Sequence, residues 1–346
     1  MIRYILIFVT CINTLLNGQY SKVTDFAQSI TEQELKELLY VYASDYFEGR
    51  RTGSKGQKIA VDFLRDHYID LNIQAAEGTK NYFQEMILKV DGKMVSTENV
   101  AAIIKGSEFP DEYIVLTSHL DHIGIEGGQI NNGADDDGSG TVTMLEIAEA
   151  LQIASENGYK PKRSIVFLHV TGEEEGLLGS AYYSENPLYP LEQTIVNLNI
   201  DMIGRNDSLH ESDEDYLYLI GSDILSQDLH DISISINKKY SNLDLDFRYN
   251  DPLLKVYERG RHYANRYYYR SDHYNFARKD IPVIFYFSGT HEDYHLPTDT
   301  VEKINYPLLT KRARFIFHTL WELANREDRI RLNSNKKYLN IDKNGR

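Results

Sequence analysis

Histidine and carboxylate side chains gather in five short segments of this sequence, and both are common ligands of metal ions. The segments are residues 118–122 (SHLDH), 133–137 (GADDD), 173–176 (EEEG), 199–202 (NIDM) and 294–295 (YH). Two imidazoles with three or more carboxylates form a mixed nitrogen and oxygen ligand set that suits a pair of zinc-like ions. A carboxylate can bridge two cations and offset their mutual repulsion. The residue types therefore predict a metal site.

His119 and Asp121 stand two residues apart at the end of a predicted strand, so their side chains can point to the same side. One could bind a metal ion while the other orients it, because a carboxylate that takes the second imidazole N–H fixes the tautomer. Taken alone, the pair also fits a strand-end histidine with a neighbouring ionic partner. The other segments must decide between the two interpretations.

Asp135, Asp136 and Asp137 lie between glycines, directly before a predicted helix. An aspartate at a helix N-cap or in the first turn accounts for one or two of them without any metal. Three in a row exceed what capping requires. The alternating ligand spacing and the distal glutamate of an EF-hand are absent, which excludes that type of calcium loop.

Glu173, Glu174 and Glu175 follow another predicted strand. Taken alone they fit a solvated acidic turn. Neighbouring glutamates that point in different directions could instead divide the work, one binding metal and the other accepting a proton from water. Asp201 ends a further apolar strand, and His295 lies in a loop after the last strand. Their joint arrival at strand ends, in a chain without another cofactor motif, favours the metal site.

From residue 99 onward, short apolar segments alternate with helical patterns. Strands are predicted at residues 100–104, 114–117, 164–170, 194–200, 216–220 and 283–287, and helices at 139–154 and 308–324. Residues 31–34 (TEQE) form a capping box that opens an earlier helix, and residues 59–67 carry a second amphipathic stripe. The alternation predicts an α/β fold of three αβα layers around a mixed, largely parallel sheet. Sites in such sheets lie beyond the strand C-termini, where the metal-ligand segments fall.

Residues 1–18 resemble a secretory signal peptide, with Arg3 before an apolar run that ends near Gly18. Cleavage there would remove Cys11, the only cysteine, and leave a chain without thiol chemistry. We therefore expect export to a periplasm or to the outside of a cell. A lipoprotein acylated at Cys11 is the alternative, although Thr10 matches that motif poorly. No other run is long enough to span a bilayer, so stable membrane insertion is not expected.

The rest of the chain is predicted to form one domain, residues 19–325, with a polar tail at 326–346. Within it, residues 205–265 are first acidic and then rich in Tyr and Asn, and we interpret them as an insertion that walls the site. The net charge is −15, from 37 Lys and Arg against 52 Asp and Glu, and no basic stripe is visible. Nucleic acid is therefore not an expected partner.

The order and spacing of these motifs resemble the co-catalytic zinc peptidases of the M28 aminopeptidase type. The resemblance runs from about Ser44 to Ile304 and includes residues 43–50 (ASDYFEGR), the five segments above, 271–273 (SDH) and 294–300 (YHLPTDT). It implies a zinc-peptidase-like (phosphorylase/hydrolase-like) fold. It further implies that His119 and Asp201 hold one zinc ion, that Glu174 and His295 hold the other, and that Asp135 bridges both. Glu173 would be the general base and Asp121 the partner of His119, and the Asp135–Asp136 peptide is often cis in relatives.

We therefore predict an aminopeptidase that hydrolyses the N-terminal residue of peptides with a free N-terminus. Two zinc ions are the expected cofactors, and cobalt or manganese would fit the same ligands. One alternative is a glutaminyl-cyclase-like aminoacyltransferase that uses a single zinc ion. Others are a carboxypeptidase-like or other amide hydrolase and a catalytically silent binding module of the same fold. The residue preference at the substrate N-terminus stays open.

Overall fold

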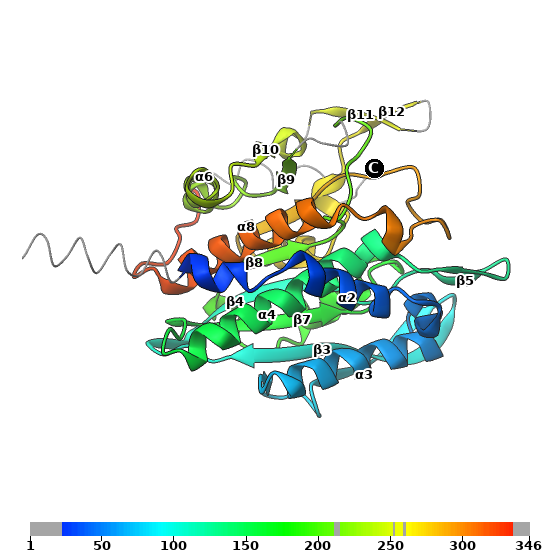
Figure 1. Cartoon of the computed structure of the whole chain (residues 1–346), viewed down its shortest axis with the longest axis horizontal. Helices are drawn as coiled ribbons and strands as arrows, with labels where there is room; N and C mark the ends of the chain where they lie inside the picture. The colour runs from blue at the N-terminus through cyan, green and yellow to red at the C-terminus, as the bar shows by residue number, and fades with distance from the viewer. Residues whose placement is uncertain (1–22, 211–214, 252, 259–260, 335–346) are drawn as a thin grey trace, which may run out of the picture.

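A mixed β-sheet runs through the middle of the computed structural model, which describes residues 23–210, 215–251, 253–258 and 261–334 (Figure 1). Its strands lie in the order β1-β3-β7-β4-β8-β13-β9-β10, and β2 pairs with β3. The four central strands are parallel to one another, and antiparallel strands flank them on both sides. The strands are β1 Gln74–Ala75, β2 Phe83–Val90, β3 Lys93–Ile104, β4 Phe109–His119, β7 Arg163–Val170, β8 Thr194–Ile200, β9 Tyr216–Ile220, β10 Asp244–Asp246 and β13 Val283–Phe287.

The central strands are largely apolar on both faces, as is typical of strands covered by helices on two sides. Every residue of β7, β8 and β13 is buried. Their register places His119 opposite Val170, Thr117 opposite Asn199, and Ile200 opposite Tyr286. The C-terminal ends of β4, β7, β8 and β13 are therefore level with one another. Side chains that follow these strands meet at one edge of the sheet.

Helices cover both faces of the sheet. One face packs against α2 (Glu32–Tyr42), α3 (Lys55–Asp70), α4 (Gly140–Glu156), α6 (Gln227–Tyr240) and α8 (Tyr306–Asn325). The other face packs against α5 (Leu178–Glu185) and α7 (His273–Ala277). Adjacent residues of β4 show the division, since Ile114 belongs to the first core and Val115 to the second. The three-layer αβα prediction is confirmed, and Thr31 caps α2 as expected by accepting the Glu34 N–H.

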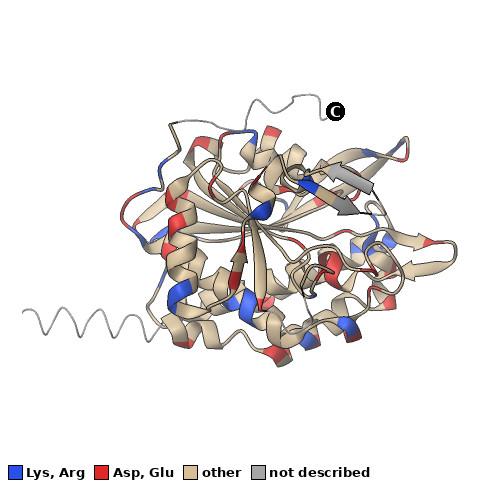
Figure 2. Cartoon of the chain, turned by 90° about the horizontal axis from the view of Figure 1, so that it is seen from above, with Lys and Arg blue, Asp and Glu red and all other residues tan. Residues whose placement is uncertain are grey.

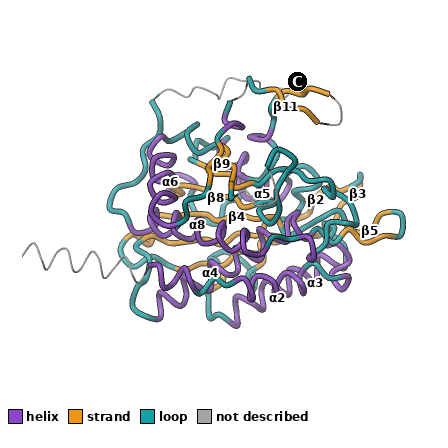
Figure 3. Tube along the Cα trace, turned by 45° about the horizontal axis from the view of Figure 1, so that its top comes forward, coloured by secondary structure: helices purple, strands orange, loops and turns teal. Residues whose placement is uncertain are grey.

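The predicted strands are all present, but the sequence analysis missed several elements. β2 and the first two thirds of β3, residues 93–100, form a hairpin that the sequence did not predict. Three described elements of the segment 205–265 join the layers, because β9 pairs with β13, β10 pairs with β9, and α6 packs beside α8. Two hairpins project from the layers, β5 (Gly124–Glu126) with β6 (Gln129–Asn131), and β11 (Lys255–Glu258) with β12 (Arg261–Ala264) (Figure 3).

Packing continues past the predicted end of the domain at residue 325. Ile330 is buried, and Arg331 makes an ion pair with Asp228 of α6 at 2.8 Å. The first part of the predicted tail thus contacts the folded layers, and residues 335–346 lie outside the described residues. The predicted signal peptide, 1–18, and Cys11 also lie outside them, so both stay predictions.

Acidic and basic residues are interspersed over the helices and loops that surround the sheet (Figure 2). None of the helices in the described part of the chain has both the length and the apolar character needed to cross a membrane.

Candidate metal centre

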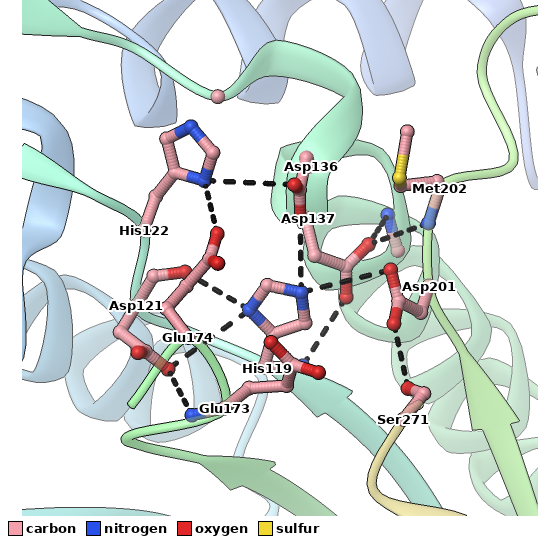
Figure 4. A network of polar contacts seen from close by, with 12 residues as sticks. His119, Asp121, His122, Asp136, Asp137, Glu173, Glu174, Asp201, Met202 and Ser271 are labelled. Carbon is pink, nitrogen blue, oxygen red and sulfur yellow. Dashed lines mark hydrogen bonds and ion pairs between the residues drawn. The ribbon is translucent and has the colours of Figure 1, made fainter. Parts of the chain in front are cut away.

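The level ends of four parallel strands bring the predicted site residues together (Figure 4). β4 ends at His119, β7 leads to Glu173 and Glu174, and β8 leads to Asp201. The loop after β13 carries His295. Parallel strands that finish at one edge of a sheet place the residues after them in a common cluster. Four of the five predicted metal ligands, His119, Glu174, Asp201 and His295, lie in this cluster.

His119 and Asp201 lie on one side of a shared carboxylate, Asp136. His119 Nε2 is 3.1 Å from Asp136 Oδ1 and 3.6 Å from Asp201 Oδ1. The Ser271 hydroxyl donates to Asp201 Oδ2 at 2.6 Å, so that the other oxygen of Asp201 faces His119. One imidazole nitrogen and two carboxylate oxygens converge here, and this donor set suits zinc.

Glu174 and His295 lie on the other side of Asp136. His295 Nε2 is 3.2 Å from Asp136 Oδ2 and 3.1 Å from Glu174 Oε2. The two oxygens of Asp136 therefore face two different histidines. This is the arrangement in which one carboxylate can bridge two cations.

The structure places Asp136, and not the predicted Asp135, between the two histidines. Asp135 Oδ1 accepts hydrogen bonds from the Gly204 N–H at 2.6 Å and from the Ser139 hydroxyl at 2.8 Å. Its Oδ2 lies 3.3 Å from His291 Nε2. These contacts hold Asp135 towards the segment after β8. The cis peptide likewise joins Asp136 to Asp137, not Asp135 to Asp136.

Asp137 holds the strand ends in place. Its carboxylate accepts hydrogen bonds from the backbone N–H groups of His119 at 3.2 Å, Gly140 at 3.0 Å and Met202 at 3.1 Å. The ligand atoms of His119, Asp137 and Asp201 lie within 4.8 Å of one another. Because three N–H groups already use the Asp137 oxygens, Asp136 is the better partner for a cation beside His119.

Several buried polar atoms at this edge have no hydrogen-bond partner among the described residues. They include His119 Nε2, Asp136 Oδ2 and Glu174 Oε1. An unsatisfied buried polar group costs about 1–3 kcal/mol, and native structures contain few of them. Cations bound between these atoms would satisfy them. The residues present therefore fit zinc-like ions.

Asp121 links His119 to Glu173. His119 Nδ1 lies 3.0 Å from the backbone carbonyl oxygen of Asp121 and 3.9 Å from its carboxylate, so the backbone oxygen is the nearer orienting group. The carboxylate accepts hydrogen bonds from the Thr52 hydroxyl at 2.9 Å and from the Glu173 N–H at 3.2 Å. Burial raises the pKa of Asp121 to about 6. Asp121 is thus placed to orient the backbone of Glu173 as well as the imidazole of His119.

Glu173 faces a small cavity of about 30 Å³ beside the metal-ligand cluster. The cavity is lined by Asp136, Glu173, Asp201, Met202, Tyr267, Arg270, Phe285, Phe287, Thr290 and Tyr294. Burial raises the pKa of the Glu173 carboxyl well above its usual range, and the negative charges of Glu174 and Asp201 act in the same direction. A carboxyl that holds its proton more readily is suited to general acid and base chemistry. We predicted that residues 205–265 form a wall of the site. None of the cavity-lining residues named above belongs to that segment, and Tyr267 and Arg270 follow it directly.

Arg50 is a structural residue of the site that the sequence analysis did not single out. Its buried guanidinium donates to the backbone oxygens of Leu120 at 3.2 Å, Tyr42 at 3.3 Å, Asn132 at 2.7 Å and Gly133 at 2.9 Å. These bonds connect the loop after His119 to the loop that carries the aspartates. In the sequence, Arg50 is visible only as the last residue of the 43–50 (ASDYFEGR) motif.

Comparison with protein families gives a match to the model of "Peptidase family M28" over residues 99–320. A glutamate carboxypeptidase 2 homolog from Caenorhabditis elegans is 32% identical over 178 residues, which are 51% of this chain and 20% of that protein. Aminopeptidase NAALADL1 from Rattus norvegicus is 36% identical over 109 residues, or 31% of this chain and 14% of that protein. The chain thus matches a fifth or less of the length of these two relatives.

Solved structures share the fold at low sequence identity. An aminopeptidase from Aneurinibacillus sp. strain AM-1 superposes with a TM-score of 0.66 at 15% identity, covering 89% of this chain and 97% of that chain. A zinc aminopeptidase from Bacillus subtilis gives a TM-score of 0.65 at 16% identity and covers 87% and 98%. A glutaminyl cyclase from Porphyromonas gingivalis gives 0.62 at 17% and covers 84% and 97%. The fold is therefore shared by aminopeptidases and a cyclase, and the chemistry must be argued from the site.

Proposed function

Because the chain belongs to peptidase family M28, we propose that it is a zinc-dependent exopeptidase that removes the N-terminal residue of peptides. The observation that carries the proposal is the position of Asp136 between two ligand groups. His119 and Asp201 lie beside one of its oxygens, and Glu174 and His295 lie beside the other. Bound zinc ions would polarise the scissile carbonyl and lower the pKa of the attacking water.

Glu173 is the residue that we assign to proton transfer. Its carboxylate would take a proton from the attacking water and pass it to the leaving amine. Its backbone N–H donates to Asp121 Oδ1 at 3.2 Å, so its position is tied to the residue that also contacts His119. The amine of a free substrate N-terminus would be received by a bound zinc ion or by a nearby carboxylate.

Two observations bear on the competing activities. A single-zinc cyclase needs one ligand group, whereas the carboxylate of Asp136 is flanked by two. A carboxypeptidase would instead need a cationic side chain for the substrate C-terminal carboxylate. Arg270 lines the cavity, where its guanidinium lies over the Tyr267 ring at 5.1 Å and donates to the Tyr294 hydroxyl at 3.3 Å. The experiment must therefore distinguish recognition of the amine from recognition of the carboxylate.

The test compares the zinc-loaded protein with Glu173→Gln on peptides that are free, blocked at the N-terminus or amidated at the C-terminus. Release of the first residue from free and amidated peptides, but not from N-blocked ones, is the expected result. Glu173→Gln should abolish release while its zinc content stays unchanged. Glu175→Gln is the matched control, because this neighbouring glutamate pairs with Arg51 at 3.1 Å and should retain activity.

Other outcomes would point to the other activities. Release of the last residue, lost on C-terminal amidation, would identify a carboxypeptidase. Loss of ammonia from peptides that begin with glutamine, without hydrolysis, would identify a cyclase. No reaction by a protein that holds zinc would move the assignment to a binding module.

We also propose that the protein is exported, on the charge and length pattern of residues 1–18. The N-terminal sequence of the protein recovered from the cell envelope or medium tests this. A chain that begins near residue 19 supports export, and an intact Met1 contradicts it.

A further inference from the structure

His122 is a fully buried histidine beside the second ligand group, and the proposed mechanism does not use it. Neither of its ring nitrogens has a hydrogen-bond partner among the residues that the structure describes. Its Nδ1 lies 2.8 Å from Glu174 Oε1 and 3.9 Å from Asp136 Oδ2 (Figure 4). Both of these oxygens also lack a hydrogen-bond partner within the described chain. One ring nitrogen and two carboxylate oxygens, all buried and without hydrogen-bond partners in the described chain, therefore face one another.

The contact between His122 and Glu174 does not have the alignment of a hydrogen bond. The 2.8 Å distance between His122 Nδ1 and Glu174 Oε1 is short enough for a hydrogen bond, so the N–H···O angle must be too small for one. Oε1 therefore lies to the side of the direction in which the ring nitrogen would donate or accept. His119 Nε2 has the same relation to Asp136 Oδ1, at 3.1 Å and again without a hydrogen bond. An oxygen beside the axis is expected when a cation occupies the axis and binds both atoms. His122 thus shares the geometry of a residue already assigned as a ligand.

The surroundings hold the His122 ring in this position. A Cβ atom at Gly133 would lie 2.6 Å from two atoms of the ring, so only glycine leaves room for it. The Gly133 carbonyl oxygen accepts a hydrogen bond from the buried guanidinium of Arg50 at 2.9 Å. On another side, the His295 ring meets the His122 ring edge-on, with centroids 5.9 Å apart. The ring is therefore fixed by packing before any ion binds.

We propose that His122 is a further ligand of the second metal ion, through Nδ1, together with Asp136, Glu174 and His295. The ligand atoms of His122, Asp136 and Glu174 lie within 4.8 Å of one another. This inference deepens the proposed function and rests on its assumption that zinc binds at this edge of the sheet.

The added ligand would make the two ions unequal. The second ion would have four protein ligands, which is the number found in closed, structural zinc sites. The first ion, with His119, Asp136 and Asp201, would keep an open position, as catalytic zinc does. The second ion should therefore be held more tightly, and the first should be the one that meets the substrate.

The experiment measures zinc binding without substrate. The metal-free protein, His122→Ala and His122→Asn are titrated with zinc against a chromophoric chelator, and X-ray absorption spectroscopy counts the imidazoles around zinc. His318→Asn is the control, because His318 is a buried histidine of α8 that stacks on Tyr240 at 3.9 Å, away from the site. Circular dichroism verifies that each variant is folded.

Loss of a direct ligand should weaken one of the two zinc affinities by more than about 100-fold in both variants, since residues that only orient a ligand cost 10–100-fold. The imidazole count should fall from three per two zinc ions to two, and His318→Asn should leave both unchanged. A wild-type count of two imidazoles would overturn the inference. Full affinity in His122→Asn would also overturn it, because asparagine keeps an N–H donor and would replace a merely orienting histidine.

These outcomes are separable from those of the proposed function. A wild-type protein that binds zinc with three imidazoles but releases no residue from peptides supports the ligand and contradicts the aminopeptidase. A folded wild-type protein that binds no zinc contradicts both.

Discussion

Exchanging Asp135 and Asp136 for asparagine, one at a time, tests which of two adjacent carboxylates belongs to the metal site. Asp136→Asn removes the oxygen charge shared by the two ligand groups, so the proposed zinc ions should be lost on gel filtration. Asp135→Asn should keep the proposed ions, because its carboxylate faces Gly204 and Ser139. Asp135→Asn should instead lower the free energy of unfolding.

The size of that loss follows from the two hydrogen bonds to Asp135 Oδ1, at 2.6 and 2.8 Å in a fully buried place. A hydrogen bond to a charged group contributes about 1.5–3 kcal/mol and a neutral one about 0.5–1.5, so two such exchanges should cost about 2 kcal/mol. Urea unfolding of the metal-free proteins measures this difference, and elemental analysis measures the zinc. The reasoning is refuted if Asp135→Asn loses zinc while Asp136→Asn retains it.

Three further predictions concern groups around the site and in the core. Burial and the charge of Glu34 raise the pKa of Glu146 to about 8, so the folded state binds more protons than the unfolded state above pH 4.5. The free energy of unfolding should therefore fall by about 3 kcal/mol from pH 5 to pH 8. Urea unfolding of Glu146→Gln should show a weaker dependence on pH. An unchanged dependence would contradict the assignment of this effect to Glu146. Burial lowers the pKa of His169 to about 3, so the fold holds it neutral where the unfolded chain is protonated. The free energy of unfolding should fall by about 3 kcal/mol as the pH drops from 6.5 to 4. His169→Gln should remove this decrease. If the variant loses as much stability in acid as the wild type, His169 is not the cause. Arg50→Lys leaves several buried carbonyl oxygens without donors, so it should lower the free energy of unfolding by about 3 kcal/mol and weaken zinc binding. A variant that unfolds in urea and binds zinc as the wild type does would show that the guanidinium hydrogen bonds are dispensable.

The sequence predicted the elements that make up the sheet centre because those strands are buried on both faces. β7 and β8 are rich in Ile, Val, Leu and Phe, and the two predicted spans agree with the observed bounds within one residue. β2 was missed although its exposure alternates along Phe83–Val90, as expected of a strand with one solvated face. The short edge strand β10, by contrast, is polar and carries no such pattern.

The choice between Asp135 and Asp136 could not be made from the sequence. Both carboxylates stand in the same acidic, Gly-flanked run. What separates them is the N–H of Gly204 and the ring of His291, which reach Asp135 from distant parts of the chain. Such contacts follow from the sheet order, which periodicity does not give. His122 was left without a role for the same reason, since its relation to Glu174 depends on β4 and β7 being neighbours.

Hydrogen bonds from other residues hold the crowded carboxylates of the site in place, while some of the carboxylate oxygens face histidines. Ser271 holds one oxygen of Asp201, and three backbone N–H groups hold Asp137. Asp299 accepts the backbone N–H groups of Asp135 and Asp136 at 3.0 and 3.2 Å, which fixes the Asp136 backbone while its carboxylate stays directed at the histidines. Like charges fixed at such distances repel one another unless cations lie between them. The second oxygen of Asp201 and both oxygens of Asp136 face His119 and His295, and this is where we propose that cations bind.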